Sequence, residues 1–173
     1  MTVVKVGGSL YDHPALGPGL RAYLATLPAP VLVVPGGGGF ADAVRKLDAV
    51  HRLGEEAAHW LAIESLALAA RFLRRLAPGF DVLNAPSFCA AHDTLPHTWD
   101  VTTDSVAAHA AGVCGAARLI LLKSAAVPPG TPWAEAAARG WVDPYFPAAV
   151  ARHGYTVEAV NFRAWLDERF PPT

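Results

Sequence analysis

The chain has 173 residues, of which 53% are hydrophobic and 17% are charged, and its formal net charge is -1. This length fits a single domain, and the apolar composition predicts a well-covered core together with a subunit interface. The near-neutral charge argues against a nucleic-acid-binding surface, and no apolar run approaches the roughly 18 residues of a membrane span. The two cysteines, Cys89 and Cys114, make no disulfide framework. We therefore expect a cytoplasmic enzyme or binding protein with no nucleic-acid or membrane partner.

Two valine-rich segments near the N-terminus each run into glycines. The first reads Val-Val-Lys-Val-Gly-Gly-Ser over residues 3–9, and the second reads Val-Leu-Val-Val-Pro-Gly-Gly-Gly-Gly over residues 31–39. β-Branched residues favour strands, and glycines allow the tight loops that follow them. Because ligands bind outside the carboxyl ends of parallel strands, both loops are predicted to lie on the ligand-binding edge of a parallel sheet.

The rest of the chain divides into alternating strands and helices, judged by apolar spacing and turn residues. Helices are predicted over residues 13–27, 40–53, 55–76, 102–113, 133–138, 147–153 and 162–170. Strands are predicted over residues 80–83, 87–91, 118–124 and 155–160. The alternation predicts a three-layer αβα sandwich around a mainly parallel sheet, with residues 1–173 forming one domain.

Four features are expected to meet at the same sheet edge: Lys5 with its glycine loop, the glycines at 36–39, Asp104 at a helix start, and Lys123 at a strand end. Glycine loops and helix N-termini present backbone N–H groups that bind phosphate oxygens. Two lysines add full positive charges where a transferring phosphoryl group gathers negative charge. Asp104 would either hold the two ammonium groups or coordinate a metal. The combination indicates phosphoryl transfer.

Neither glycine run matches the Walker A or the Gly-x-Gly-x-x-Gly pattern, which argues against a P-loop enzyme or a Rossmann dehydrogenase. The four motifs instead resemble the amino acid kinase superfamily, which includes acetylglutamate kinase, aspartokinase, bacterial uridylate kinase and isopentenyl phosphate kinase. Three longer stretches, at residues 36–45, 58–63 and 99–105, are similar to a small branch of that superfamily. This branch contains the furan-phosphate kinase of methanofuran biosynthesis and relatives in methylotrophic bacteria.

The resemblance implies a site and its ligands. It implies ATP as the phosphoryl donor, with Mg²⁺ bridging the ATP phosphates and no metal site formed by the protein itself. The implied catalytic residues are Lys5, Asp104 and Lys123. The residues implied to bind the nucleotide are Gly7, Gly8, Ser9, Lys123 and Ser124. The residues expected to contact the substrate are Gly36, Gly37, Gly38, Gly39, His59, Trp99, Asp100 and Thr102.

The implied function is an ATP-dependent kinase that phosphorylates a small phosphate or carboxylate acceptor, such as a furanmethanol phosphate in one-carbon cofactor biosynthesis. The amino acid kinase-like fold is expected with a shortened C-terminal part, because Ser-Ala-Ala-Val-Pro-Pro-Gly at 124–130 replaces the usual Thr-Asp-x-x-Gly-Val. This departure keeps an alternative open, a catalytically silent subunit or an oxyanion-binding protein. The apolar segment 55–76 predicts a homo-oligomer, dimeric or larger, and a partner kinase subunit is a further option.

Several of these residues also have purely structural interpretations. Asp104 could simply cap its helix, and a histidine such as His59 is more often a core or interface residue than a ligand contact. We do not interpret His92, Asp93 and His97 as a metal site.

Overall fold

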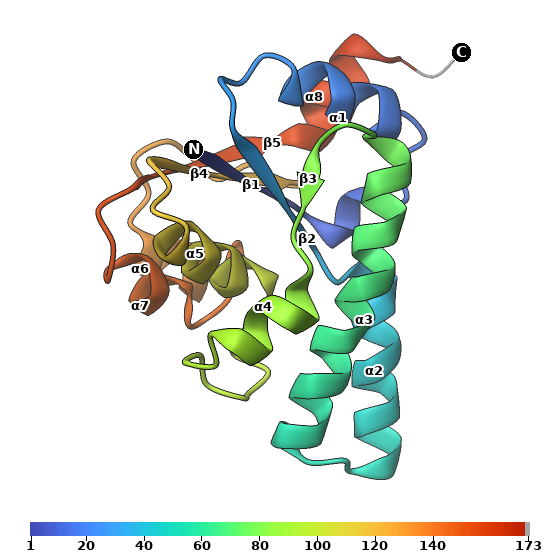
Figure 1. Ribbon diagram of the computed structural model, residues 1–173, viewed down its shortest axis with the longest axis vertical. Helices are drawn as coiled ribbons and strands as arrows, with labels where there is room; N and C mark the ends of the chain where they lie inside the picture. The colour runs from blue at the N-terminus through green and yellow to red at the C-terminus, as the bar shows by residue number, and fades with distance from the viewer. Residues whose placement is uncertain (172–173) are drawn as a thin grey trace.

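The computed structural model describes residues 1–171 and places five parallel strands in one sheet of order β3-β2-β1-β4-β5 (Figure 1). The strands are β1 (Thr2–Val6), β2 (Val31–Pro35), β3 (Asp81–Val82), β4 (Arg118–Lys123) and β5 (Thr156–Asn161). β1 lies at the centre, paired with β2 on one side and β4 on the other. The carboxyl ends of these three strands therefore meet at one edge, as the sequence predicts.

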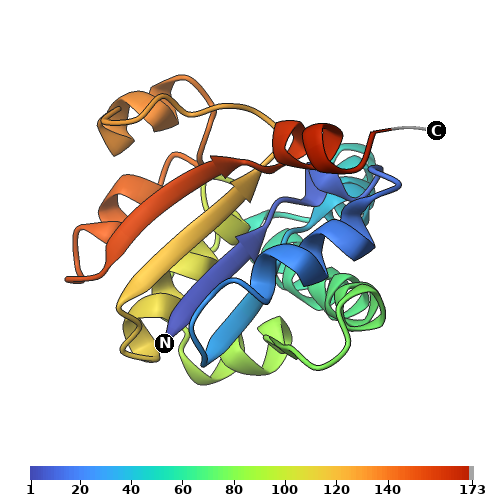
Figure 2. The ribbon, with the colours of Figure 1, turned by 90° about the horizontal axis from the view of Figure 1, so that it is seen from above.

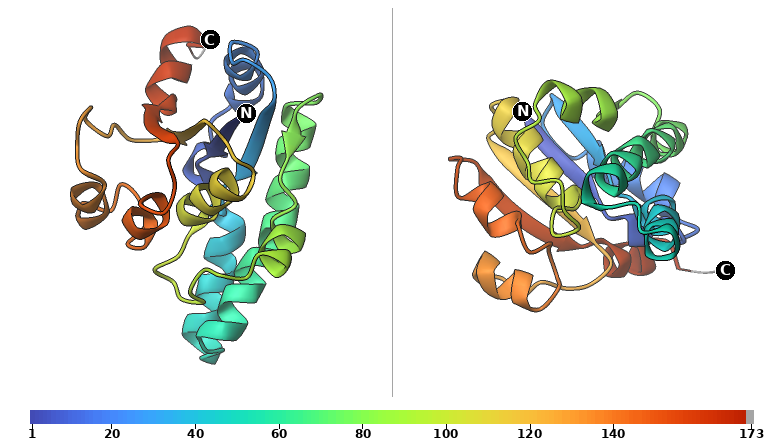
Figure 3. Two further views of the ribbon diagram at one scale, coloured as in Figure 1. Left: turned by 60° about the vertical axis from the view of Figure 1, so that its left-hand side comes forward. Right: turned by 90° about the horizontal axis from the view of Figure 1, so that it is seen from below.

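Helices cover both faces of the sheet (Figure 2). α1 (Leu16–Leu24) and α8 (Phe162–Arg169) pack on one face, while α4 (Ala85–Ala91), α5 (Thr103–Val113), α6 (Trp133–Ala138) and α7 (Phe146–Val150) lie on the other. α3 (Glu55–Leu76) contributes to both cores beside β2 and β3, and pairs with α2 (Gly38–His51). These two long helices project beyond the sheet as a hairpin (Figure 3). The predicted αβα sandwich is confirmed, with a sheet that is parallel throughout the described residues.

The alternation of side chains along the central strands explains where the lysines point. Val4 and Val6 face the core formed with α1 and α8, whereas Val3 faces the core formed with α5. Successive strand residues point to opposite faces, so Lys5 lies on the α5 side with Val3. Lys5 pairs with Leu121 of β4, and Lys123 follows two residues later on that same face. Both lysines are thus directed towards the start of α5.

One predicted strand is wrong. Residues 87–91 belong to α4, whose first residue is Ala85. The Asn84 side chain accepts a hydrogen bond from the Ser87 backbone N–H at 3.4 Å, and Pro86 lies in the first turn. A cap of this kind and an early proline both favour the start of a helix. A segment of five residues is too short to show the helical period, which is why the pattern was ambiguous in the sequence.

Apolar side chains remain exposed on the α2–α3 hairpin. Leu47 and Val50 on α2 are 52% and 74% exposed, and Leu61 and Leu68 on α3 are 46% and 53% exposed. None of the helices described between residues 1 and 171 is long and apolar enough to cross a membrane. The homo-oligomer stays a prediction.

The two glycine loops touch through their backbones. A Cβ atom added at Gly8 would lie 2.1 Å from the backbone nitrogen of Gly38, and one added at Gly36 would lie 2.3 Å from the backbone nitrogen of Gly8. By contrast, a Cβ atom at Gly39 would meet nothing within 4 Å. Gly8 and Gly36 are therefore required for the approach of one loop to the other, whereas Gly39 is free of this constraint.

We expect Gly8→Ala to destabilise the protein by about 2 kcal/mol or more, because the added methyl group overlaps backbone atoms that cannot move independently. Gly39→Ala is the matched control. It should leave the free energy of unfolding unchanged or slightly raised, since alanine is the better helix former. Urea denaturation followed by circular dichroism measures both variants. Equal stability of the two variants would contradict the loop contact.

Candidate active site

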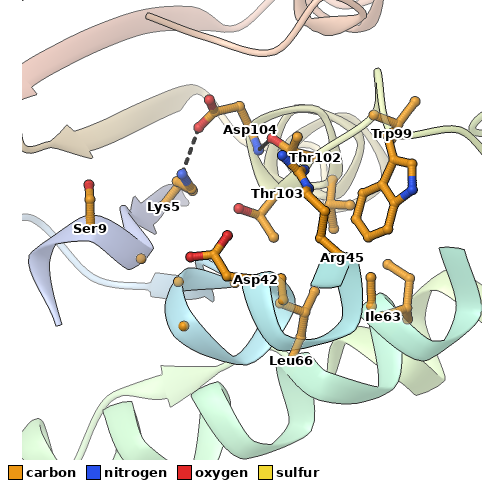
Figure 4. Close-up of a pocket in the computed structure, with 18 of the residues that line it drawn as sticks. Lys5, Ser9, Asp42, Arg45, Ile63, Leu66, Trp99, Thr102, Thr103 and Asp104 are labelled. Atoms are coloured by element: carbon orange, nitrogen blue, oxygen red, sulfur yellow. Dashed lines mark hydrogen bonds and ion pairs between the residues drawn. The ribbon is translucent and has the colours of Figure 1, made fainter. Parts of the chain in front are cut away.

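A cavity of about 740 Å³ opens outside the carboxyl ends of β1, β2 and β4 (Figure 4). The two glycine loops, the start of α5, the inner face of α3 and the segment before α5 form its walls. Its lining residues are Lys5, Gly8, Ser9, Tyr11, Asp12, Gly37, Gly38, Gly39, Ala41, Asp42, Arg45, His59, Ala62, Ile63, Leu66, Thr98, Trp99, Val101, Thr102, Thr103, Asp104, Val106, Lys123 and Gly140. The cavity has the size of a typical small-molecule site.

Three charged side chains meet at one end of this cavity, and we call them the Lys-Asp-Lys cluster. The Lys5 ammonium lies 2.8 Å from Asp104 Oδ1, and the Lys123 ammonium lies 2.8 Å from Asp104 Oδ2. The Lys123 contact is also a hydrogen bond, whereas the Lys5 contact falls outside hydrogen-bonding geometry. Within the described chain, Oδ1 accepts no hydrogen bond. Asp104 thus faces one ammonium group with each of its two oxygens.

Burial strengthens the electrostatics of the cluster. Asp104 is 3% exposed and Lys5 is 5% exposed. Burial alone would raise the pKa of Asp104, but the charges of Lys5 and Lys123 outweigh it and hold that pKa below its ordinary value. Burial and the nearby charge of Lys5 lower the pKa of Lys123. With all three groups ionised, the cluster carries one net positive charge, which suits an anionic phosphoryl group.

The two glycine loops also bring backbone N–H donors to the end of the cavity that holds the Lys-Asp-Lys cluster. η1 (Gly8–Leu10) is a single 3₁₀ turn, and α2 begins at Gly38. The first N–H groups of a helix have no partner within it, and they favour anions. Gly8, Ser9, Gly37, Gly38 and Gly39 all line the cavity, in agreement with the sequence prediction of their position.

Three residues predicted to bind ligands hold the loops together, and their predicted roles in binding stay predictions. The Gly7 N–H donates to the Leu122 carbonyl at 2.8 Å, and the Gly36 carbonyl accepts from the Tyr11 hydroxyl at 2.7 Å. Ser124 Oγ is hydrogen-bonded to Ser9 Oγ at 2.8 Å. None of these three residues lines the cavity. The structure therefore gives them a role in holding the loops in place.

Trp99 lies at the end of the cavity away from the cluster (Figure 4), and His59 and Thr102, which were also predicted to contact substrate, line the cavity. The Trp99 indole N–H donates to Asp48 Oδ2 at 2.8 Å, and the Arg45 guanidinium lies 4.6 Å from the ring centroid. These contacts fix the tryptophan as a rigid wall. Asp100, the remaining predicted contact, is exposed and lies outside the cavity lining. The functional roles of these residues stay predictions.

Sequence reasoning missed two charged residues of the cavity. Asp42 and Arg45 lie on the first turns of α2 and line the cavity together (Figure 4). Both belong to the stretch 36–45, so the same motif that carried the glycines could have indicated them. They are spaced three residues apart, which places their side chains on one face of the helix.

Asp143 is a further missed residue, and it organises the start of α5 from outside the cavity. It is 5% exposed. Its Oδ2 accepts hydrogen bonds from the Thr102 N–H at 3.0 Å, the Thr102 hydroxyl at 2.8 Å and the Ser105 N–H at 2.9 Å. Its Oδ1 accepts from the Ser105 hydroxyl. Because Asp104 lies between Thr102 and Ser105, these bonds determine where the carboxylate of the cluster sits.

The carboxylate of Asp104 is engaged by the two lysines of the cluster. Among residues 1–171, no group of three or more His, Cys, Asp or Glu side chains could hold a metal ion. The Asp104 carboxylate already faces two ammonium groups, one on each oxygen. Of the two roles that the sequence left open for Asp104, the geometry therefore favours holding the lysines.

Comparison with known proteins supports the resemblance seen in the motifs. No protein-family model matches the chain. Over 124 residues the chain is 29% identical to [5-(aminomethyl)furan-3-yl]methyl phosphate kinase of Methanocaldococcus jannaschii, a match that covers 61% of this chain. The chain spans 57% of the length of that relative. That relative is a furan-phosphate kinase, the kind of protein that the motifs resemble.

Comparison with solved structures finds a protein of similar architecture. The structure is similar to the crystal structure of uridylate kinase from Archaeoglobus fulgidus, with a TM-score of 0.64 and 18% sequence identity. The alignment covers 92% of this chain and 90% of that one. The predicted amino acid kinase-like fold is confirmed. Both of these similar proteins are kinases.

We expect Asp143→Ala to destabilise the protein by about 3 kcal/mol, because the donors of Thr102 and Ser105 lose their buried acceptor. Asp143→Asn keeps one carbonyl oxygen and should retain more stability. Asp81→Asn, at an exposed position on β3, is the control and should leave the free energy of unfolding within about 0.5 kcal/mol. Urea denaturation measures all three variants. An Asp143→Ala variant as stable as the control would contradict this role.

Proposed function

We propose that the protein is an ATP-dependent kinase that transfers the γ-phosphoryl group to a small phosphomonoester. The observation that carries this proposal is the Lys-Asp-Lys cluster at the junction of the two glycine loops. Lys5, Asp104 and Lys123 come from three different elements, and two of them are strongly buried. Burying charged groups is costly, so a cluster facing a cavity is better explained by chemistry than by stability.

In the proposed reaction, an oxygen of the acceptor phosphate attacks the γ-phosphorus of ATP, and the bond from that phosphorus to the β,γ-bridging oxygen breaks. ADP leaves with the electron pair of that bond, and the acceptor becomes a diphosphate. Lys5 and Lys123 stabilise the negative charge on the transferring group, and Asp104 keeps both ammonium groups in position. The N–H groups at Gly8 and Gly38 bind phosphate oxygens. Such positioning and charge stabilisation account for most of the catalysis in phosphoryl transfer.

The acceptor end of the cavity suits an anionic ring compound. Trp99, Ile63 and Leu66 provide an aromatic and apolar wall, and Arg45 brings a guanidinium beside it (Figure 4). Guanidinium groups bind phosphate and carboxylate oxygens through paired hydrogen bonds. The similarity to a furan-phosphate kinase supports a furanmethyl phosphate as acceptor, in one-carbon cofactor biosynthesis.

Replacing Lys5 tests the proposal. With furan-3-ylmethyl phosphate and ATP–Mg²⁺, we expect Lys5→Ala to lower the rate of ADP release by about a hundredfold or more, because one of the two charges on the transferring group is lost. Lys46→Ala, on α2 and outside the cavity lining, is the matched control and should keep the wild-type rate. A coupled pyruvate kinase–lactate dehydrogenase assay measures both.

Turnover that is unchanged in Lys5→Ala would overturn the proposed mechanism. Calorimetric titration with ATP–Mg²⁺ tests the alternative function that the sequence analysis left open. A wild-type protein that binds no nucleotide would be a catalytically silent subunit or an oxyanion-binding protein on the same fold.

A further inference from the structure

His97 is held between two carboxylates next to the acceptor end of the cavity. Its Nδ1 lies 2.5 Å from Glu56 Oε2, and its Nε2 lies 2.7 Å from Asp93 Oδ1. A carboxylate can only accept hydrogen bonds, and one carboxylate faces each ring nitrogen of His97. Two such acceptors favour a proton on both ring nitrogens. The geometry therefore favours the imidazolium cation.

The cation lies directly against a second histidine. The rings of His97 and His59 are stacked, with centroids 4.2 Å apart and planes inclined by 16°. Trp60 packs its edge against both rings and donates its indole N–H to Glu56 Oε1 at 2.9 Å. Two positive charges at this separation repel each other strongly in a partly buried setting. With His97 charged, His59 is consequently neutral.

The surroundings of each ring agree with this assignment. Burial and the neighbouring charge of His97 lower the pKa of His59, which is 9% exposed. The hydrogen bonds to Glu56 and Asp93 raise the pKa of His97. The titratable groups around His59 come from α3, α4, the segment before α5 and α5 itself. They are Glu56, Cys89, His92, Asp93, His97 and His109.

His59 is the member of this pair that faces the substrate. It lines the large cavity, together with Trp99 and Thr98 of the segment that carries His97. His97 itself does not line the cavity. A neutral imidazole N–H can hold an acceptor oxygen without protonating it, so the oxygen keeps its nucleophilicity. A charged imidazolium at the same place would favour transfer of its proton to the phosphate.

We propose that His97 is a positioning residue that acts through His59. As a cation held by Glu56 and Asp93, it keeps His59 neutral and holds the segment with Trp99 against α3. His59 then serves as an uncharged hydrogen-bond partner for the phosphate of the acceptor. This inference rests on the proposed function for the nature of the acceptor.

The arrangement operates in a defined pH window. The contacts of His97 are present below its raised pKa and are lost as the pH rises through that value. His59 becomes charged only as the pH falls through its lowered pKa. The kcat should therefore fall as the pH drops through the lowered pKa of His59, because the acceptor oxygen is then protonated. The KM for the acceptor should rise as the pH increases through the raised pKa of His97, because the segment with Trp99 then loses its hold on α3.

The protonation states can be measured directly in the wild-type protein by ¹⁵N NMR of the imidazole nitrogens. At pH 7 we expect both nitrogens of His97 to carry protons and His59 to show the signals of a neutral ring. Adding inorganic phosphate, without ATP, should shift the His59 signals. A neutral His97 or His59 signals that do not respond to phosphate would overturn the inference, whether or not the protein shows turnover.

A variant series tests the role of His97 in the reaction. With furan-3-ylmethyl phosphate at pH 7, His97→Gln should raise KM by about tenfold, the loss expected for a hydrogen bond to a charged group, with kcat within about threefold of wild type. The alkaline rise of KM should disappear in this variant. His51→Gln, at the end of α2, is the matched control. An unchanged pH profile of KM in His97→Gln would also overturn the inference, whereas absence of turnover in the wild type would count against the proposed function alone.

Discussion

A single buried carboxylate, shared by two lysines, is the interaction on which the rest of the site depends. Lys5 and Lys123 end neighbouring parallel strands and point to the same face of the sheet. Two ammonium groups this close would repel each other in a buried setting, and each would lose hydration. Asp104 offsets both costs by placing one oxygen against each lysine. The cluster keeps one uncompensated positive charge for a ligand in the cavity.

The surrounding residues hold this carboxylate in a fixed position. Asp143 binds the backbone and hydroxyl groups on either side of Asp104, and thereby fixes the first turn of α5. Gly8 and Gly36 let the two loops approach to backbone contact, so their N–H groups converge on the same end of the cavity. The acceptor end is held differently, by aromatic stacking and by exposed ion pairs. Positive charge and rigid donors are thus concentrated where a phosphoryl group would be transferred.

Local patterns were enough to predict most of the elements and the residues of the charged cluster. The helix over 55–76 is bounded by Gly54 and by Pro78-Gly79, and its predicted limits agree with α3. Lys5, Asp104 and Lys123 could be predicted because each stands at the end or the start of an element, next to a recognisable motif. The strand predicted at 87–91 is wrong because the Asn84 cap, and not the five residues of the segment themselves, decides that this segment is helical.

The remaining residues could not be predicted because their roles arise only from tertiary contacts. Asp143 lies in a short segment between two small helices, and nothing in its neighbourhood indicates that it reaches α5. His97 is hydrogen-bonded to Glu56, which precedes it by 41 positions in the chain. Trp99 was expected to contact substrate, but its anchoring by Asp48 and Arg45 required the packing of α2 beside the segment before α5.

The central claim is that the Lys-Asp-Lys cluster transfers a phosphoryl group to another phosphate. ³¹P NMR of a mixture of ATP–Mg²⁺, furan-3-ylmethyl phosphate and protein tests this claim most directly. The account predicts a new pair of coupled phosphorus signals from a diphosphate ester, appearing together with ADP, and their absence when Asp104→Asn replaces the wild type. Release of inorganic phosphate without those coupled signals, or equal product formation by Asp104→Asn, would contradict it.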